Sequence, residues 1–315
     1  MTLAVDREED VVAHRFGPRV ILENSITRCS VAPFMLPALV ALVAVLSTVG
    51  LRPQSQEPPA VEPEDEASVR ATSEEERAVE VDLAERLGSL LYAKVRLVEE
   101  ATAAAALVVD RRTLGSAHRS VVVSQDGQWT VRFVGSAGDR VVSYYDVAFS
   151  AEGTPRVRLL DSPQTVSTEE SSLYRAKQAA TREMPFRCPS SYRTIGLPSL
   201  EDYGWTVYLL PQSDDRDLIS IGGHLRAEVS RDGTKVESIG ALAAGCQTAP
   251  ADAVASGDLG DGFWVMHTRS PTPHEVHVYL SLIHDVPLFV GTWNGVWLVE
   301  DGVVGFAYSW EDRPR

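Results

Sequence analysis

Four histidines lie close together near the C-terminal end of the chain, and they carry the clearest potential for chemistry. His267, His274, His277 and His284 fall within 18 residues. Imidazole is the commonest protein ligand for transition metals and also acts as a general acid or base near neutral pH. The spacing therefore raises two possibilities, a metal site and a hydrolytic site.

The side-chain pattern around these histidines argues against a metal site. Apolar residues occupy every second position from 276 to 282, which is typical of a half-buried β-strand over residues 276–283. Successive side chains of a strand point to opposite faces, so His277 points away from the face that His274 shares. The sequence therefore predicts no metal site, and it leaves His267, His274 and His277 as weak candidates only.

The polar face of this predicted strand is a candidate binding face. A strand over residues 288–293 follows it, and the turns Asn294-Gly295 and Asp301-Gly302 predict a three-stranded meander. We expect the meander to complete the sheet that precedes it, because a small meander is only marginally stable alone. The candidate face comprises His277, Tyr279, Ser281, Trp293 and Trp297.

Cys188 and Cys246 are a candidate disulfide. One follows a predicted helix and the other a predicted hairpin of the same module, so they can meet and oxidise outside the cytoplasm. Cys29 precedes an apolar segment and is not expected to join them. The chain lacks the sequence signatures of phosphate-binding loops, serine hydrolases and zinc proteases, and residues 258–262 lack the ligand pattern of an EF-hand. No cofactor is predicted.

The elements that must position these residues occur twice. Capping boxes at Ser73 and Ser167 each open a helix, over residues 74–107 and to about residue 184. After each helix come a strand with the string Trp-Thr-Val, a second strand, a glycine turn and a third strand. We predict an α+β fold, with related helix-plus-antiparallel-sheet modules at residues 73–161 and 162–315, the second including the C-terminal β-meander.

The second module resembles the PepSY-like and cystatin-like extracytoplasmic domains. The resemblance rests on the terminal hairpin, HLRAEVSRDGTKV at residues 224–236, and on the preceding helix with Ala176, Ala179 and Ala180. It covers residues 167–240 and, less closely, residues 74–160. The acidic residue usual before the turn is matched only loosely. Members of that group bind or restrain other proteins, often peptidases, so the resemblance implies a binding or regulatory role.

The N-terminal segments predict a membrane attachment. Residues 31–51 carry no charge and are long enough to cross a bilayer as a helix. Basic residues precede this span and are sparse after it, which places residues 1–30 in the cytoplasm. We predict an uncleaved signal-anchor; the alternatives are a cleavable signal peptide and a buried core helix. Residues 52–72 are an acidic, proline-rich spacer.

The charge of the chain excludes general nucleic-acid binding. It carries 29 basic and 44 acidic side chains, a formal net charge of -15. The sequence predicts a membrane-anchored or exported envelope protein of bacterial type, with a non-catalytic binding, inhibitory or sensing role toward an envelope protein or peptide. One alternative is a structural envelope component that pairs through the helix over residues 74–107. Another is an envelope hydrolase that combines His267, His274 or His277 with Glu275 or Asp285.

Overall fold

The computed structural model describes residues 73–188, 191–200, 204–213, 215, 217–243, 245–250 and 263–312. The predicted tail, span and spacer (residues 1–30, 31–51 and 52–72) lie outside the described residues, as does the loop at residues 258–262. Among the helices that are described, none has both the length and the apolar character needed to cross a membrane.

A long helix opens the described chain. Helix α1 spans Glu74–Ala106, 33 residues, and begins at the capping box predicted from the sequence. The Ser73 hydroxyl accepts a hydrogen bond from the Glu76 amide at 3.1 Å, and the Glu76 carboxylate accepts one from the Ser73 amide at 2.8 Å. These bonds pair two amides that the first helical turn otherwise leaves without a partner. The helix over residues 74–107 is thus confirmed to within one residue.

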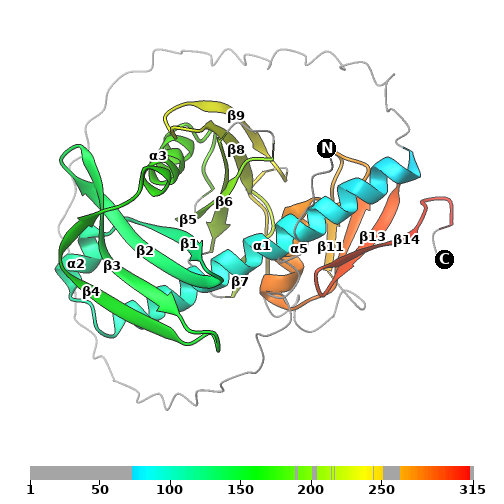
Figure 1. Ribbon diagram of the computed structural model, residues 1–315. Helices are drawn as coiled ribbons and strands as arrows, with labels where there is room; N and C mark the ends of the chain where they lie inside the picture. Colours follow the sequence, from blue (N-terminus) through cyan, green and yellow to red (C-terminus); the bar gives the residue numbers. More distant parts are fainter. Residues whose placement is uncertain are drawn as a thin grey trace, which may run out of the picture. The chain divides into compact units, whose positions relative to one another are not determined.

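The first sheet is an antiparallel meander in the order β1-β2-β3-β4 (Figure 1). The short helix α2 (Arg111–Ser116) precedes it. Asp126 and Gly127, both at positive φ, form the turn between its first two strands, as the Asp-Gly signal predicts. The strands are β1 (Arg119–Gln125), β2 (Gln128–Ala137), β3 (Arg140–Phe149) and β4 (Pro155–Thr165).

The second sheet repeats this order after helix α3 (Thr168–Arg182), which begins at the predicted capping box of Ser167. Trp129 and Trp205 each lie in the second strand of their sheet, and Gly153 and Gly233, both at positive φ, each precede the last strand. The strands are β5 (Ser191–Pro198), β6 (Gly204–Gln212), β8 (Leu225–Ser230) and β9 (Val236–Ala241), and a separate pair is formed by β7 (Leu218–Ser220) and β10 (Thr248–Pro250). The repeated order of elements predicted from the sequence is present, whereas β5 was not predicted.

The C-terminal meander has the predicted strands but not the predicted neighbours. It forms a sheet of its own in the order β11-β12-β13-β14, in which β11 runs parallel to β12, and it does not complete the second sheet. The meander gains support from helices α1 and α5, which pack against it. Its elements are β11 (Phe263–Met266), β12 (Leu288–Thr292), β13 (Gly295–Glu300) and β14 (Val303–Tyr308).

The segment predicted as a strand over residues 276–283 is a helix. Helix α5 spans Glu275–His284, with His274 as N-cap and Asp285 as a left-handed C-cap. The prediction fails because this helix packs on α1 and on the third sheet, so both apolar and polar residues of its first two turns are buried. The apparent alternation therefore does not separate a buried face from an exposed one.

Helices α1 and α5 approach closely at Gly88. A β-carbon built on Gly88 would lie 2.5 Å from Cβ of Val278 and 2.6 Å from the Glu275 carbonyl oxygen. Two helices whose backbones come this close require a residue without a side chain. The contact places the first turns of α5 against the middle of α1.

Replacing Gly88 tests this close approach. Alanine is the better helix former by about 1 kcal/mol, yet we expect Gly88→Ala to lower the free energy of unfolding by about 1–3 kcal/mol, because the new methyl group overpacks the contact. Chemical denaturation followed by circular dichroism measures it. Gly115→Ala in α2 is the matched control, since nothing lies within 4 Å of its added β-carbon; a gain in stability from both variants would contradict the contact.

Candidate functional site

Two of the clustered histidines cap helix α5. The His274 imidazole accepts a hydrogen bond at Nδ1 from the Val276 amide (3.2 Å), and His277 Nδ1 accepts one from the His274 amide (3.1 Å). This is a capping box with imidazoles in place of the usual hydroxyl and carboxylate. Residues three apart lie on the same side of a helical turn, so the rings stack with centroids 3.9 Å apart.

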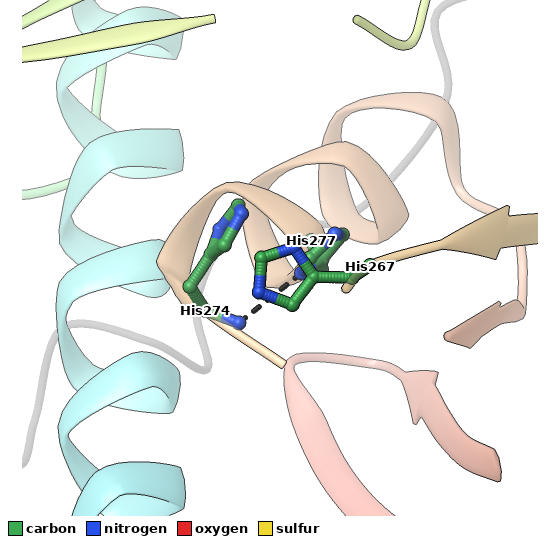
Figure 2. A group of neighbouring side chains, drawn as sticks. All are labelled: His267, His274 and His277. Carbon is green, nitrogen blue, oxygen red and sulfur yellow. Dashed lines mark hydrogen bonds between the residues drawn. The ribbon is translucent and has the colours of Figure 1, made fainter. Parts of the chain in front are cut away.

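His267, just after β11, completes the cluster. Its ring meets those of His274 and His277 edge-on, with centroids 4.7 and 5.0 Å away, and Figure 2 shows it lying beside the two others. One ring nitrogen from each of the three histidines can be chosen so that all lie within 4.8 Å of one another. The expectation that His274 and His277 cannot meet is therefore wrong, because it assumed a strand.

The histidine cluster is inside the protein. Burial lowers the pKa of His267 to about 4 and that of His277 well below its usual value, and in both cases the neighbouring His274 adds to the effect. His224 is also buried, and its Nδ1 has no hydrogen-bond partner among the residues that the structure describes. The imidazoles are consequently neutral at pH 7, which leaves each of them a lone pair.

The candidate binding face is not a surface of the protein. Only Trp293, 41% exposed, faces solvent, while His277 and Ser281 are each 2% exposed and Tyr279 and Trp297 are also buried. The Ser281 hydroxyl bonds the Val286 and Val299 carbonyl oxygens at 2.7 and 3.1 Å. These residues form part of the interior because α5 is a helix enclosed by its neighbours.

The acids of the hydrolase alternative are bonded to groups other than the clustered histidines. Glu275 accepts hydrogen bonds from Tyr208 (2.9 Å) and Arg226 (3.1 Å). Burial raises the pKa of Glu275, but His274, Arg226 and these bonds outweigh burial and keep the pKa below its usual value. Asp285 caps the opposite end of α5. Glu275 is thus held as an ion-paired carboxylate.

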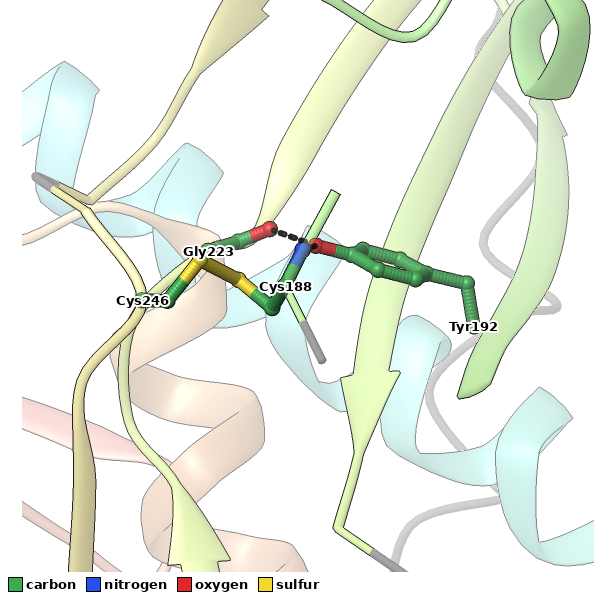
Figure 3. The surroundings of a disulfide bond; sticks show 4 residues. All are labelled: Cys188, Tyr192, Gly223 and Cys246. Carbon is green, nitrogen blue, oxygen red and sulfur yellow. Dashed lines mark hydrogen bonds between the residues drawn. A yellow bond between two sulfur atoms is a disulfide. The ribbon is translucent and has the colours of Figure 1, made fainter. Parts of the chain in front are cut away.

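Cys188 and Cys246 form a disulfide, with Cα atoms 5.4 Å apart. The Tyr192 hydroxyl lies beside this bond, where it accepts from the Cys188 amide (3.1 Å) and donates to the Gly223 carbonyl (3.2 Å) (Figure 3). Gly223 has a φ of +80° and lies directly against the Cys188 sulfur, so no other residue fits there without strain. The disulfide ties the end of α3 to the chain that follows β9.

A separate cavity of about 220 Å³ lies where α1, β1, β2 and β5 meet. Arg119 of β1 and Arg193 of β5 line it. The side chains of Val98, Phe133 and Tyr192 form the apolar and aromatic part of its wall. Arg193 is paired with Glu99 at 2.7 Å, whereas Arg119 donates to the neutral Thr194 hydroxyl at 3.3 Å. The remaining lining residues are Thr102, Ala117, His118, Ser120 and Thr194.

Two buried lysines add to the positive charge at this cavity. Lys177 of α3 is 2% exposed and donates to the carbonyl oxygen of Ser120, a residue of the cavity wall, at 2.6 Å. Lys94 of α1 lies one helical turn before Val98 and is buried as well. No ion pair joins Lys94, Lys177 or Arg119 to a carboxylate among the described residues.

Burial dominates the ionisation of these lysines. It lowers the pKa of Lys177 to about 7, with further lowering by Arg119 and Lys94, and it lowers the pKa of Lys94 to about 8. Lys177 thus lies close enough to both Arg119 and Lys94 for their positive charges to disfavour its protonated form. The arrangement can therefore hold a negatively charged group that enters the cavity.

This cationic cavity was missed in the sequence, although a signal was present. Lys94 falls among Leu91, Val95 and Val98, and Lys177 falls among the alanines of the buried stripe of α3. Lysine on the apolar side of an amphipathic helix is uncommon unless it is paired. Helical periodicity alone therefore places both lysines on the apolar side of their helices.

Comparison with known proteins assigns no family to the chain. No family model, no curated protein and no solved structure matches it. The resemblance to PepSY-like domains stays a prediction, and the functional argument rests on the residues themselves.

Removing the disulfide tests its contribution to stability. We expect the double variant Cys188→Ser, Cys246→Ser to lower the free energy of unfolding by about 2–4 kcal/mol, because the unfolded chain gains freedom when a 58-residue separation is no longer closed. Thermal denaturation without reductant measures the difference. Cys29→Ser should leave stability unchanged; equal stability of the double variant would contradict the bond.

Removing a buried cation tests the electrostatic cost at the cavity. Lys94→Met keeps the aliphatic stem and should raise the free energy of unfolding at pH 7 by about 1–4 kcal/mol, since a desolvated and unpaired charge is replaced by an apolar group. Lys235→Met is the control, because the Lys235 side chain is 71% exposed and the change should lie within about 0.5 kcal/mol.

The difference in stability between the wild type and Lys94→Met should depend on pH. The pKa of Lys94 is about 8 in the folded protein and 10.5 without burial, so the unfolded chain binds more protons between these values. The wild-type protein should therefore gain stability relative to Lys94→Met as the pH rises from 8 to 10.5. A difference that is constant over this window would contradict the assignment.

Proposed function

We propose that the protein is an extracytoplasmic, membrane-tethered binding protein that holds an anionic group of its ligand or partner in the cavity at Arg119. The observation that carries this proposal is the set of cations beside that cavity that form no ion pair with a carboxylate in the part of the chain that the structure describes. The role is one of binding rather than catalysis.

The energetics of burial support an anionic ligand. A buried charge that lacks a partner destabilises a fold by several kcal/mol, and a lysine can relieve this only by losing its proton. Lys94 and Lys177 are both buried and form no ion pair among the described residues. Lys94 is also close enough to Lys177 to lower its pKa. An anion in the cavity would offset the repulsion among the cations and restore their protonated forms. Stability that is given up in this way is typical of functional sites.

The size and lining of the cavity limit what enters it. A pocket for a drug-sized ligand occupies about 300–1,000 Å³, so a cavity of about 220 Å³ takes one end of a larger molecule. Phe133, Tyr192 and Val98 offer apolar contact next to the charge of Arg119. A carboxylate or another small oxyanion that ends an apolar group fits this combination.

The location outside the cytoplasm has separate support. An uncharged stretch at residues 31–51 precedes the fold, and the disulfide between Cys188 and Cys246 is of a kind that persists in oxidising compartments. The alternative of pairing through the helix over residues 74–107 has less support, because the buried side of α1 is already packed within the chain.

Titration with small anions tests the proposal. We expect sulfate and hexanoate to bind the purified full-length protein at one site, and their relative affinities to distinguish a tetrahedral oxyanion from a carboxylate with an apolar tail. Arg119→Gln and Lys177→Met should each weaken binding by about tenfold or more, which corresponds to about 1.4 kcal/mol. Isothermal titration calorimetry at low ionic strength measures both affinities.

Two controls make this result specific. Binding should weaken as the pH rises from 6.5 to 9, because Lys177 and Lys94, with pKa values of about 7 and 8, lose their charge over this range. Lys235→Met removes one exposed cation that does not line the cavity and should bind like the wild type. The proposal fails if neither anion binds, or if Arg119→Gln and Lys177→Met bind as tightly as Lys235→Met.

A further inference from the structure

The loop before α5 is held rigidly around the histidine cluster. The His267 amide donates to the Gly291 carbonyl at 2.7 Å, which fixes the start of the loop on β12. The Thr292 hydroxyl donates to the Pro271 carbonyl at 2.9 Å, and the Thr272 hydroxyl donates to Glu80 of α1 at 2.8 Å. The three imidazoles are thus brought together by a preorganised scaffold of two helices and a sheet.

The hydrogen bonds around two of the rings define which nitrogen carries the proton and which carries the lone pair. The Ser270 hydroxyl donates to the Thr272 carbonyl at 2.5 Å, so it accepts from Nε2–H of His267 at 2.7 Å. His274 likewise donates Nε2–H to the Leu242 carbonyl at 2.9 Å. Both rings therefore keep the lone pair on Nδ1. Histidines that ligate a metal characteristically donate their second N–H to an oxygen in this way.

From this geometry we infer that His267, His274 and His277 bind one transition-metal dication of the zinc type. Neutral imidazole nitrogens are preferred ligands of such ions. Three protein ligands leave the fourth position of a tetrahedral ion open for water or another donor. The inference uses none of the residues of the cationic cavity and stands independently of the proposed function.

The capping bonds of α5 compete with the metal, and their strength decides the outcome. The Nδ1 atoms of His274 and His277 accept from backbone amides, so coordination would give up one or both of these bonds. A backbone hydrogen bond of this kind contributes far less to stability than the coordination of a zinc ion by protein ligands. Coordination therefore outweighs the loss of the caps.

The apolar surroundings of the cluster favour retention of a bound ion. His267 and His277 are almost fully buried, and the Pro271-Thr272-Pro273 segment beside them is buried too. Glu275, the residue after His274, places a buried carboxylate beside the cluster, where it would offset part of the charge of the ion.

Metal titration of the full-length protein tests the inference. We expect the tag-free protein, purified in detergent and stripped with a chelator, to bind one equivalent of Zn²⁺ in competition with a chromophoric chelator. Bound Co²⁺ should show the intense visible absorption of a tetrahedral ion. The melting temperature should rise when Zn²⁺ is added.

The variants are chosen so that the fold survives. Glutamine is a regular residue at the third position of a capping box, so His277→Gln removes an imidazole and keeps the cap of α5; His267→Gln removes the imidazole that has no capping role. Each should weaken Zn²⁺ binding by about 100-fold or more and abolish the Co²⁺ absorption. His284→Gln, at the far end of the same helix, is the matched control. Wild-type binding that is no tighter than that of His267→Gln and His277→Gln, with all four proteins folded by circular dichroism, would overturn the inference.

Discussion

Both candidate sites depend on the packing of helix α1. Gly88 lets α5 approach its backbone, and Glu80, two turns earlier, bonds the loop that carries the histidines. Farther along the same helix, Lys94 contributes a buried cation and Val98 lines the cavity. One 33-residue helix thus sets the position of the imidazoles toward its start and of the cations toward its end. A change in its contact with α5 would displace the histidine cluster directly.

Both sites place polar side chains inside the protein, in different ways. At the cavity, Arg119 and Lys94 both disfavour the charged form of Lys177, and no ion pair to a carboxylate offsets these cations among the described residues. At the cluster, His274 and His277 bond backbone groups and His267 bonds the Ser270 hydroxyl, and the neutral imidazoles can exchange the capping bonds for a metal. Buried polar groups destabilise a fold unless they are paired, so the first site favours an anion and the second a dication. The side chains of the two sites come from different elements: the histidines lie after β11 and at the start of α5, and the cations lie on α1, α3 and β1.

Local signals in the sequence predicted much of the fold. The capping boxes at Ser73 and Ser167, the Asp-Gly and Asn-Gly turns and the strands between them are all present, because each depends on a few neighbouring residues. Features that depend on tertiary contacts were harder to predict. Residues 276–283 have an alternating pattern, yet their surroundings enclose them on several sides and make them a helix. That error then placed His277 on an exposed face and separated it from His274.

The residues of the candidate sites are brought together by such long-range contacts. The histidines could be singled out by type and spacing, but their convergence depends on a helix that the pattern did not reveal. The cations of the cavity come from α1, α3 and β1, which are far apart in the sequence, so their proximity follows only from the tertiary packing. The pairing of Cys188 with Cys246 was accessible because both cysteines end elements of one module.

If the buried lysines serve to bind an anion, they must take up protons when the anion enters the cavity. The test is a calorimetric titration of the protein at pH 8 with whichever of sulfate and hexanoate binds more tightly. It is carried out in two buffers of different ionisation enthalpy. Because an anion restores the charge of Lys177 and Lys94, whose pKa values are about 7 and 8, binding should take up protons, and the uptake should fall in Lys177→Met. Binding heats that are the same in both buffers would contradict the account.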